Sequence, residues 1–184
     1  MKVYTGENVR NVGLVGHGDT GKTSLASAFL YTAGVINRGG RVDEGTTITD
    51  FDEEEIQRKV SIWSALAHAE WPSSAKASEG KADSNVKINF LDTPGYNLFI
   101  NDTKAALVAA DSCLLLVDAV AGVEVVTEKV WDFAVEYSQP VVFVINKMDR
   151  ENASFARTLE ALPPPRAVTS RPVASSKEKR KIRL

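Results

Sequence analysis

Four short runs of apolar residues recur along the chain. They comprise Val12–Val15, Val86–Leu91, Cys113–Val117 and Val141–Ile145. Apolar runs of this length, bounded by polar and turn-forming residues, are typical of strands that are covered on both faces, as in parallel sheets. We therefore predict four buried strands.

Helical periodicity fills several of the segments around these runs. It spans Thr23–Gly34, Glu124–Tyr137 and Glu151–Leu162, and the last segment places Phe155, Leu159 and Leu162 on one stripe. Strands that alternate with helices predict an α/β fold with a largely parallel sheet and right-handed crossovers.

A fifth strand is predicted at Val60–Trp71, antiparallel to Val86–Leu91. The joining segment, Pro72–Asn85, is rich in Ser, Ala and Lys, so we expect a flexible hairpin loop. Asn37–Arg58 also has a loop-like composition, with three glycines and a run of acidic residues. Long loops in a compact domain usually serve function or lack order.

The composition is that of a globular protein. The chain has 184 residues, 43% of them hydrophobic and 25% charged, which suits one compact domain with a short tail. The net charge is −2, but residues 163–184 hold seven basic side chains and one acidic, which leaves −8 on residues 1–162. An acidic body argues against a general nucleic-acid coat protein, and we expect no direct DNA binding.

Cysteine and histidine are too few for several classes of site. The single cysteine, Cys113, excludes an intrachain disulfide framework and a multi-cysteine zinc site, and we expect it in the core. His17 and His68 lie 51 residues apart, which argues against a histidine-rich metal site, and His68 is predicted on the exposed face of a strand. With no apolar run near the roughly 20 residues that span a bilayer, and no signal peptide, we expect no membrane partner and a cytoplasmic setting.

The first chemical motif is G-x-x-x-x-G-K-T, directly after the predicted strand Val12–Val15. It comprises Gly16, His17, Gly18, Asp19, Thr20, Gly21, Lys22 and Thr23. The glycines free backbone N–H groups for a phosphate chain, and the following helix adds the positive end of its dipole. Lys22 is expected to reach the β- and γ-phosphates, and the Thr23 hydroxyl is expected to bind Mg²⁺.

The second motif follows the predicted strand Val86–Leu91. It comprises Asp92, Thr93, Pro94 and Gly95. An acid at this strand end can hold Mg²⁺ directly or through water, and the Gly95 N–H can face a γ-phosphate. An N-capped turn is the simpler interpretation of this motif when it stands alone.

The third motif follows the predicted strand Val141–Ile145. It comprises Asn146, Lys147, Met148 and Asp149. A carboxylate at Asp149 can accept from two N–H groups of guanine, which adenine does not offer. The Lys147 stem can lie against the purine, and Asn146 can tether the loop that carries the first motif. A polar turn is the alternative interpretation.

In this order and at these strand ends, the three motifs resemble the G domain of GTPases. Asp118–Val123, Glu128, Val130 and Trp131 are in addition similar to translational GTPases and to the elongation factor G family. The resemblance covers about residues 8–162. It implies binding of GTP or GDP with Mg²⁺, the ribosome as a partner, and ribosome-dependent GTP hydrolysis in translocation.

Two departures from the family pattern concern the reaction. Arg58–Ile62 replaces the family's R-G-I-T-I, so Ser61 stands for a Mg²⁺-binding threonine, unless it is only a polar residue at a strand start. Tyr96 stands where elongation factors have a histidine that orients the attacking water. A phenol can hold a water but cannot take its proton near neutral pH, and Tyr96 is equally explained as a packing residue of a diverged paralogue. The resemblance makes Lys22, Gly95 and Tyr96 the catalytic candidates, and Thr23, Ser61 and Asp92 the metal ligands.

A third departure concerns the C-terminal part of the chain. Pro163–Pro165 ends the last predicted helix, and Ser175–Lys177 only superficially resembles the family's guanine-capping loop. We therefore expect an incomplete G domain at residues 1–162, lacking its last strand, helix and capping loop, as in a truncated or frame-shifted reading frame. Residues 163–184 are predicted to be a disordered basic tail or, alternatively, a tail that docks on RNA. Two further hypotheses are a guanine-nucleotide binding module without turnover and a non-functional fragment.

Overall fold

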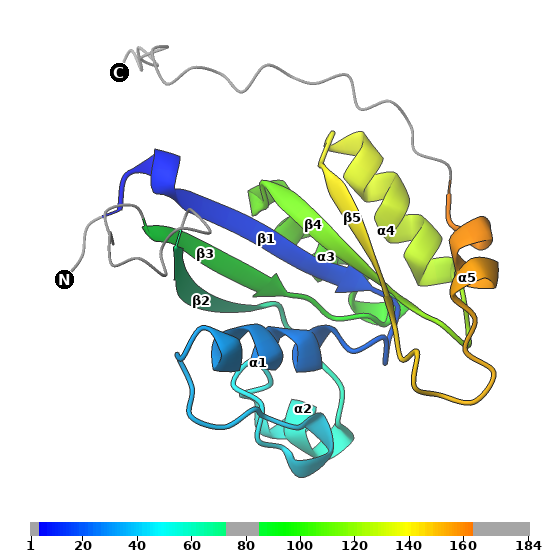
Figure 1. Ribbon diagram of the computed structural model, residues 1–184, viewed down its shortest axis with the longest axis horizontal. Helices are drawn as coiled ribbons and strands as arrows, with labels where there is room; N and C mark the ends of the chain where they lie inside the picture. The colour runs from blue at the N-terminus through cyan, green and yellow to red at the C-terminus, as the bar shows by residue number, and fades with distance from the viewer. Residues whose placement is uncertain (1–3, 73–84, 164–184) are drawn as a thin grey trace.

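The computed structural model describes residues 4–72 and 85–163, and their strands form one five-stranded sheet in the order β2-β3-β1-β4-β5 (Figure 1). The strands are β1 (Val9–Gly16), β2 (Ala65–Pro72), β3 (Asn85–Asp92), β4 (Ser112–Asp118) and β5 (Val141–Asn146). Strands β2 and β3 pair antiparallel, and the other neighbours pair parallel. The predicted α/β fold, its mostly parallel sheet and its hairpin are confirmed.

Helices cover both faces of the sheet (Figure 1). The helices of the structure are α1 (Lys22–Thr32), α2 (Glu53–Arg58), α3 (Ile100–Ala109), α4 (Val125–Glu136) and α5 (Phe155–Ala161), with single 3₁₀ turns at η1 (Gly6–Asn8), η2 (Val42–Glu44) and η4 (Asn97–Phe99). Helix α1 contacts β1, β2 and β3, whereas α3 and α4 contact each other and pack over β1 and β4.

Two apolar clusters meet at β1. Leu14 and Val15 are adjacent and fully buried, and alternation along a strand sends their side chains to opposite faces. Leu14 packs with α1 and with the β2–β3 hairpin, whereas Val15 packs with α3, α4 and Cys113. Cys113 thus lies in the core as predicted, and His68 is exposed on β2 as predicted. Because the carboxyl half of β1 is buried on both faces, it gives the following loop a rigid base.

Strand β2 and helices α2, α3 and α5 differ from the sequence predictions. Strand β2 begins at Ala65 rather than at Val60, because the N–H groups of Ile62 and Trp63 bond to the Glu55 carboxylate instead of to a neighbouring strand. Helix α2 lies inside the segment predicted to be a loop, and α3 had no counterpart among the predicted helices.

Helix α5 is shorter than predicted and faces differently. It begins at Phe155, where the Ser154 hydroxyl caps it by accepting from the N–H of Arg157. Thr158 is its buried residue, while Phe155 and Leu159 of the predicted apolar stripe are half exposed. The predicted hairpin loop and the predicted basic tail lie outside the described residues, apart from their flanking positions.

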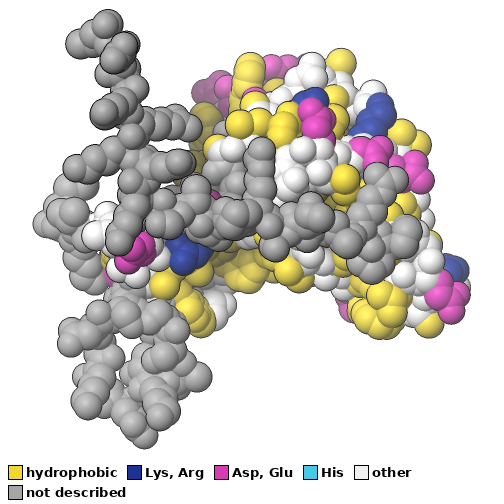
Figure 2. Space-filling model, turned by 90° about the horizontal axis from the view of Figure 1, so that it is seen from above, with side chains coloured by type: hydrophobic (Ala, Val, Ile, Leu, Met, Phe, Trp, Pro, Cys, Tyr) yellow, Lys and Arg dark blue, Asp and Glu magenta, His cyan; other side chains and the backbone are white. Residues whose placement is uncertain are grey.

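Charges of both signs are mixed on the surface. On the face shown in Figure 2, basic side chains lie singly beside acidic ones and between apolar ones. Among the described residues, no helix is long and apolar enough to cross a bilayer.

Candidate functional site

The loop between β1 and α1, residues 16–23, requires glycine at two positions. Gly16 has φ +139°, and a Cβ on it would lie 2.4 Å from the Leu116 carbonyl oxygen. Gly21 has φ +97°, and a Cβ there would lie 2.5 Å from the Asn146 amide nitrogen. Only glycine meets both demands without strain. We call this segment the phosphate loop.

Lys22 lies at the centre of this loop. Its side chain is buried, and its Nζ donates to the carbonyl oxygens of His17 at 2.7 Å and Gly16 at 3.1 Å. Burial lowers the pKa of Lys22 to about 8, against the opposing attraction of nearby carboxylates, of which Asp92 acts most strongly. The ammonium is therefore charged at neutral pH and would gain from an anion beside it.

Asp92 is the last residue of β3 and lies near Lys22. Its side chain is buried, with 2% of the residue exposed. Neither of its carboxylate oxygens has a hydrogen-bond partner among the described residues, and the same holds for the Thr49 hydroxyl. Burial raises the pKa of Asp92 to about 6, and the nearby Thr49 hydroxyl and Lys22 ammonium oppose the rise. A buried carboxylate without hydrogen bonds is costly, and a cation would satisfy it.

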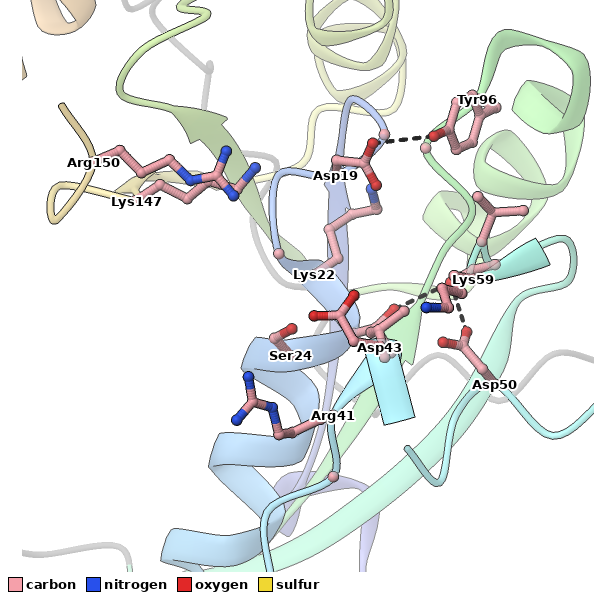
Figure 3. Close-up of a pocket in the computed structure, with 18 residues that line it drawn as sticks. Asp19, Lys22, Ser24, Arg41, Asp43, Asp50, Lys59, Tyr96, Lys147 and Arg150 are labelled. Carbon is pink, nitrogen blue, oxygen red and sulfur yellow. Dashed lines mark hydrogen bonds between the residues drawn. The ribbon is translucent and has the colours of Figure 1, made fainter. Parts of the chain in front are cut away.

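A chain of hydroxyls runs from the phosphate loop to a second acid. Thr23 Oγ1 lies 3.1 Å from Ser61 Oγ, and Ser61 Oγ donates to Asp50 Oδ1 at 2.7 Å. Thr47 Oγ1 donates to the other oxygen of Asp50 at 3.2 Å. Asp50 and Lys22 line the same cavity (Figure 3). The fold thus brings Ser61 to Thr23, as predicted from the resemblance. Together with Asp92 these groups form an oxygen-rich cluster of the kind that Mg²⁺ prefers.

Asp50, which the sequence alone does not indicate as a site residue, is 4% exposed and lines the cavity beside Lys22. Its only signal in the sequence is its place as the first acid of an acidic run, which is typical of a loop. Lys59, where the family has glycine, adopts φ +56°, so this segment keeps the left-handed backbone that glycine would favour.

Gly95 and Tyr96 lie directly against the phosphate loop. A Cβ on Gly95 would lie 2.3 Å from Lys22 Nζ and 2.6 Å from the Gly18 nitrogen. Tyr96 Oη donates to Asp19 Oδ2 at 3.2 Å, and a Cβ on Gly18 would lie 2.9 Å from the Tyr96 ring. Burial, followed by the Asp19 carboxylate, raises the pKa of Tyr96, so its phenol is protonated at neutral pH.

Two threonines fix the segment that carries Gly95. Thr93 Oγ1 donates to the Leu14 carbonyl at 2.8 Å, and Thr103 Oγ1 donates to the Pro94 carbonyl at 2.7 Å. Both threonines are fully buried. The second motif is therefore attached to β1 by the side chain of Thr93 and to α3 by the side chain of Thr103.

The third motif reaches the phosphate loop through Asn146. Its Nδ2 donates to the Thr20 carbonyl at 2.9 Å, which is the tether predicted from the sequence. Met148 and Asp149 lie exposed in the turn that follows β5. Lys147 has φ +59° and lines the cavity, as does Arg150.

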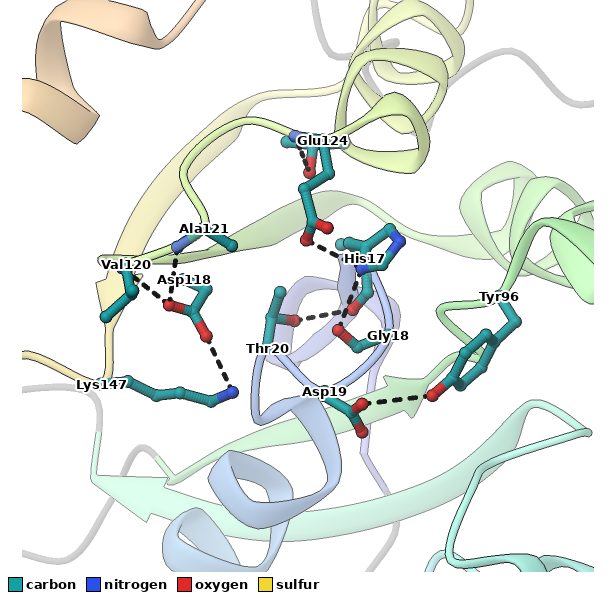
Figure 4. A network of polar contacts seen from close by, with 12 residues as sticks. His17, Gly18, Asp19, Thr20, Tyr96, Asp118, Val120, Ala121, Glu124 and Lys147 are labelled. Atoms are coloured by element: carbon teal, nitrogen blue, oxygen red, sulfur yellow. Dashed lines mark hydrogen bonds and ion pairs between the residues drawn. The ribbon is translucent and has the colours of Figure 1, made fainter. Parts of the chain in front are cut away.

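Lys147 forms an ion pair that the sequence did not predict. Its Nζ lies 2.8 Å from Asp118 Oδ2, and Asp118 Oδ1 accepts from the N–H groups of Val120 and Ala121 (Figure 4). Burial alone would raise the pKa of Asp118, but the bonds from Lys147 and the two N–H groups hold it below its usual value. Asp118 is therefore a charged anchor for the Lys147 side chain.

His17 has a partner from another element. Its Nδ1 lies 2.9 Å from Glu124 Oε2, at the N-cap of α4, and 3.1 Å from the Gly18 carbonyl oxygen. The centroids of the His17 and Tyr96 rings are 6.4 Å apart. Glu124 thus supports the outer turn of the phosphate loop, a contact between segments that no local pattern indicated.

These groups surround a cavity of about 600 Å³. Half of the predicted site residues line it, namely Gly18, Asp19, Gly21, Lys22, Thr23, Ser61, Gly95, Tyr96 and Lys147. The others lie behind this lining or beside it, namely Gly16, His17, Thr20, Asp92, Thr93, Pro94, Asn146, Met148 and Asp149. The cavity also has cationic side chains that were not predicted, from Arg41, Lys59 and Arg150.

Comparisons with known proteins agree with this geometry. A family model described as the elongation factor Tu GTP binding domain matches residues 7–165. A protein of Debaryomyces hansenii named ribosome-releasing factor 2, mitochondrial, is 38% identical over 156 residues, which are 85% of this chain and 17% of that protein. The protein of the same name from Saccharomyces cerevisiae is 43% identical over 154 residues, 84% of this chain. The chain spans 17% of the length of each of these two relatives.

Solved structures also match. A crystal structure of a protein from Thermus thermophilus has a TM-score of 0.73 and 35% identity, covering 84% of this chain and 22% of the other. A bacterial selenocysteine-specific elongation factor, EF-Sec, has a TM-score of 0.59 over 83% of this chain and 22% of its own, and at 24% identity shows likeness of fold alone.

Proposed function

The chain belongs to the elongation factor Tu GTP-binding domain family of translational GTPases, and from this premise we propose that it binds Mg²⁺·GTP and hydrolyses it as the G domain of an elongation factor G-like protein. One observation carries the proposal. A buried ammonium, Lys22, is enclosed by a glycine-dependent loop, beside a buried carboxylate, Asp92, that has no hydrogen-bond partner within residues 4–72 and 85–163. Polyphosphate and a divalent cation supply what each of these groups lacks.

We assign phosphate binding to the phosphate loop. The N-terminus of α1 and the backbone N–H groups of the loop favour anions there. Lys22 would exchange its bonds to the His17 and Gly16 carbonyls for bonds to phosphate oxygens, which are stronger because both partners are charged.

The oxygen cluster fits Mg²⁺. Thr23, Ser61 and Asp92 would hold the ion, and Asp50 would orient the Ser61 hydroxyl by accepting its hydrogen. When bound, Mg²⁺ supplies neutralising charge to the phosphate oxygens. The orphaned oxygens of Asp92 are what supports this assignment in the present structure.

In the proposed reaction, water attacks the γ-phosphorus in line, the bond to the β-phosphate oxygen breaks, and the water proton passes to phosphate oxygens. The site contributes position and charge: the Lys22 ammonium and the Gly95 N–H lie where negative charge develops. Tyr96 is a protonated phenol, so it would orient the water through its lone pairs and would not act as a base.

Base selection is assigned to Asn146 and Asp149. Asp149 is exposed at the turn after β5, so its carboxylate is free to accept from guanine N1–H and N2–H. The Lys147 stem, held by its ion pair with Asp118, would cover the purine face.

One observation favours binding without turnover as the second candidate. The Tyr96 hydrogen is donated to Asp19, and this bond directs the phenol toward the phosphate loop. If that bond holds the phenol at Asp19 when GTP is bound, the lone pairs of Tyr96 stay away from the attacking water, and the site binds nucleotide without turnover.

The wider setting of the protein is also a proposal. The relatives' names support the ribosome as a partner of the whole protein. We propose the cytoplasm as the compartment, and fractionation decides between this and the mitochondrion named for the relatives. We further propose residues 1–162 as the nucleotide-binding unit and residues 163–184 as a separate basic tail.

The decisive experiment is a titration of the 184-residue chain with fluorescent GDP, followed by competition with GTP and ATP, with Mg²⁺ and with a chelator. We expect GTP to compete, ATP to fail, and chelation to weaken binding. Lys22→Ala should weaken binding about 10- to 150-fold, the loss of one charge-assisted bond. Equal competition by ATP contradicts the proposal. Single-turnover hydrolysis with and without ribosomes then separates the GTPase from the binding module.

A further inference from the structure

Glu55 is a buried acid whose two oxygens both bond to the backbone. It is 1% exposed in α2. Its Oε1 accepts from the N–H of Ile62 at 2.9 Å and of Trp63 at 3.0 Å, and its Oε2 accepts from the N–H of Asp52 at 3.1 Å. A carboxylate that receives three N–H bonds is satisfied without a cation. Glu55 is therefore a connector between two stretches of backbone.

The stretch that Glu55 holds begins one residue after Ser61. Residues 59–64 belong to neither a helix nor a strand, so no ladder of backbone bonds fixes them. The Ser61 hydroxyl nevertheless lies 3.1 Å from the Thr23 hydroxyl. On its other side, the Ser64 N–H bonds to the Asp102 carboxylate of α3. Two acids from two helices thus fix the irregular segment that carries Ser61.

Glu55 also takes part in forming α2. The Asp52 side chain accepts from the Glu54 N–H at 2.8 Å, and the Glu55 carboxylate accepts from the Asp52 N–H. These two bonds complete a capping box. A helix of six residues is too short to be stable by itself. The cap of α2 and the position of Ser61 therefore depend on the same carboxylate.

We propose that Glu55 is a positioning residue for the metal site, which holds Ser61 in place so that its hydroxyl meets Thr23. This inference rests on the proposed function, which assigns Thr23 and Ser61 to Mg²⁺. Without Glu55, residues 61–63 would have to be ordered when the ion binds. The entropy cost of this ordering would weaken metal binding. Loss of the Glu55 carboxylate should therefore raise the Mg²⁺ concentration that nucleotide binding requires, because Ser61 is no longer held in place.

The test is a double-mutant cycle on the full chain. The Mg²⁺ concentration for half-maximal binding of a non-hydrolysable GTP analogue is measured for wild type, Glu55→Gln, Ser61→Ala and the double variant. We expect each single substitution to raise it about three- to tenfold, and the double variant to add little to the larger single effect. The matched control is Glu54→Gln, an exposed neighbour paired with Arg58, which should leave the requirement unchanged.

Several results would overturn the proposal. An unchanged Mg²⁺ requirement in Glu55→Gln, or effects that multiply fully in the double variant, would show that Glu55 does not act through Ser61. If wild type shows no Mg²⁺-dependent binding, the proposed function fails and this inference fails with it. Thermal unfolding is recorded for every variant. Should Glu55→Gln not fold, Glu55→Asp takes its place, and failure of both to fold would make Glu55 a folding residue.

Discussion

Tyr96 Oη donates a hydrogen bond to Asp19 Oδ2 at 3.2 Å and so joins the segment after β3 to the phosphate loop. The ring of Tyr96 lies over Gly18, where even a methyl group would not fit. The bond occupies the phenol hydrogen and leaves the oxygen lone pairs available. A histidine at this position would have no such hydroxyl to offer Asp19, so the departure from the family pattern changes how the two segments are connected.

The first prediction separates the two interpretations of Tyr96. Tyr96→Phe keeps the ring over Gly18 and removes only the hydroxyl. If the hydroxyl orients water, single-turnover GTP hydrolysis should fall about 10- to 100-fold, while GDP affinity stays within about twofold. Tyr31→Phe, at an exposed residue of α1, is the control. An unchanged rate would make Tyr96 a packing residue.

The second prediction concerns pH and Asp92. Its folded pKa of about 6 lies above the unfolded value of 3.8, so the folded chain binds the proton more tightly. The stability that this gives is complete below about pH 4 and is lost as pH rises through 6, about 3 kcal/mol in all. Without Mg²⁺ and nucleotide, wild type should lose this much stability relative to Asp92→Asn between pH 4 and 7, measured by urea unfolding at each pH.

The same carboxylate sets the pH dependence of metal binding. Protons compete with Mg²⁺ for Asp92, so Mg²⁺-dependent binding of GDP should strengthen from pH 5 to pH 7 in wild type. Asp92→Asn should show weak Mg²⁺ dependence at every pH. A wild-type metal affinity that is flat across this range would remove Asp92 from the ion's ligands.

The third prediction uses the close approach of Gly95 to Lys22. A methyl group at Gly95 would lie 2.3 Å from Lys22 Nζ, so Gly95→Ala must displace the segment or the ammonium. We expect hydrolysis to fall at least about tenfold, with a smaller loss of GDP affinity. Gly39→Ala serves as the control, because a Cβ there meets no atom within 4 Å. Equal losses in both variants would point to a general effect of adding a side chain.

The fourth prediction addresses base choice. In Asp149→Asn the amide can donate to the 2-oxo group of xanthine, which the carboxylate repels. Competition binding should show that preference for guanine over xanthine nucleotides falls at least about 100-fold. Asp132→Asn, an exposed acid of α4, should leave the preference as it is. Retained guanine preference in Asp149→Asn would place base recognition elsewhere.

The sequence predicted the parts of the site that depend on local rules. The phosphate loop has its glycines at positions where backbone angles and close contacts require them, so the residue types alone identify it. The apolar runs gave the strands that carry the motifs, and parallel strand ends meet at one edge of a sheet. The Asn146 bond to the Thr20 carbonyl, the predicted tether, joins the segment after β5 to the phosphate loop at that edge.

The parts that were missed depend on contacts between distant segments. One of them is the hydrogen bond that Asp50 accepts from the Ser61 hydroxyl, which no spacing in the sequence encodes. Helix α2 did carry a signal, the D-x-x-E capping box from Asp52 to Glu55, but its acidic and glycine-rich surroundings favoured a loop. On α5, capping by Ser154 and burial of Thr158 outweighed the apolar stripe.

The bond from Asn146 to the Thr20 carbonyl makes recognition of the two ends of a nucleotide reciprocal. A phosphate chain that orders the phosphate loop also fixes Asn146, and a base that engages Asn146 steadies the loop in return. Each half of the ligand then lowers the entropy cost of ordering the site for the other. Guanosine and pyrophosphate, added as separate molecules, should therefore each bind more tightly in the presence of the other, by equal factors as linkage requires.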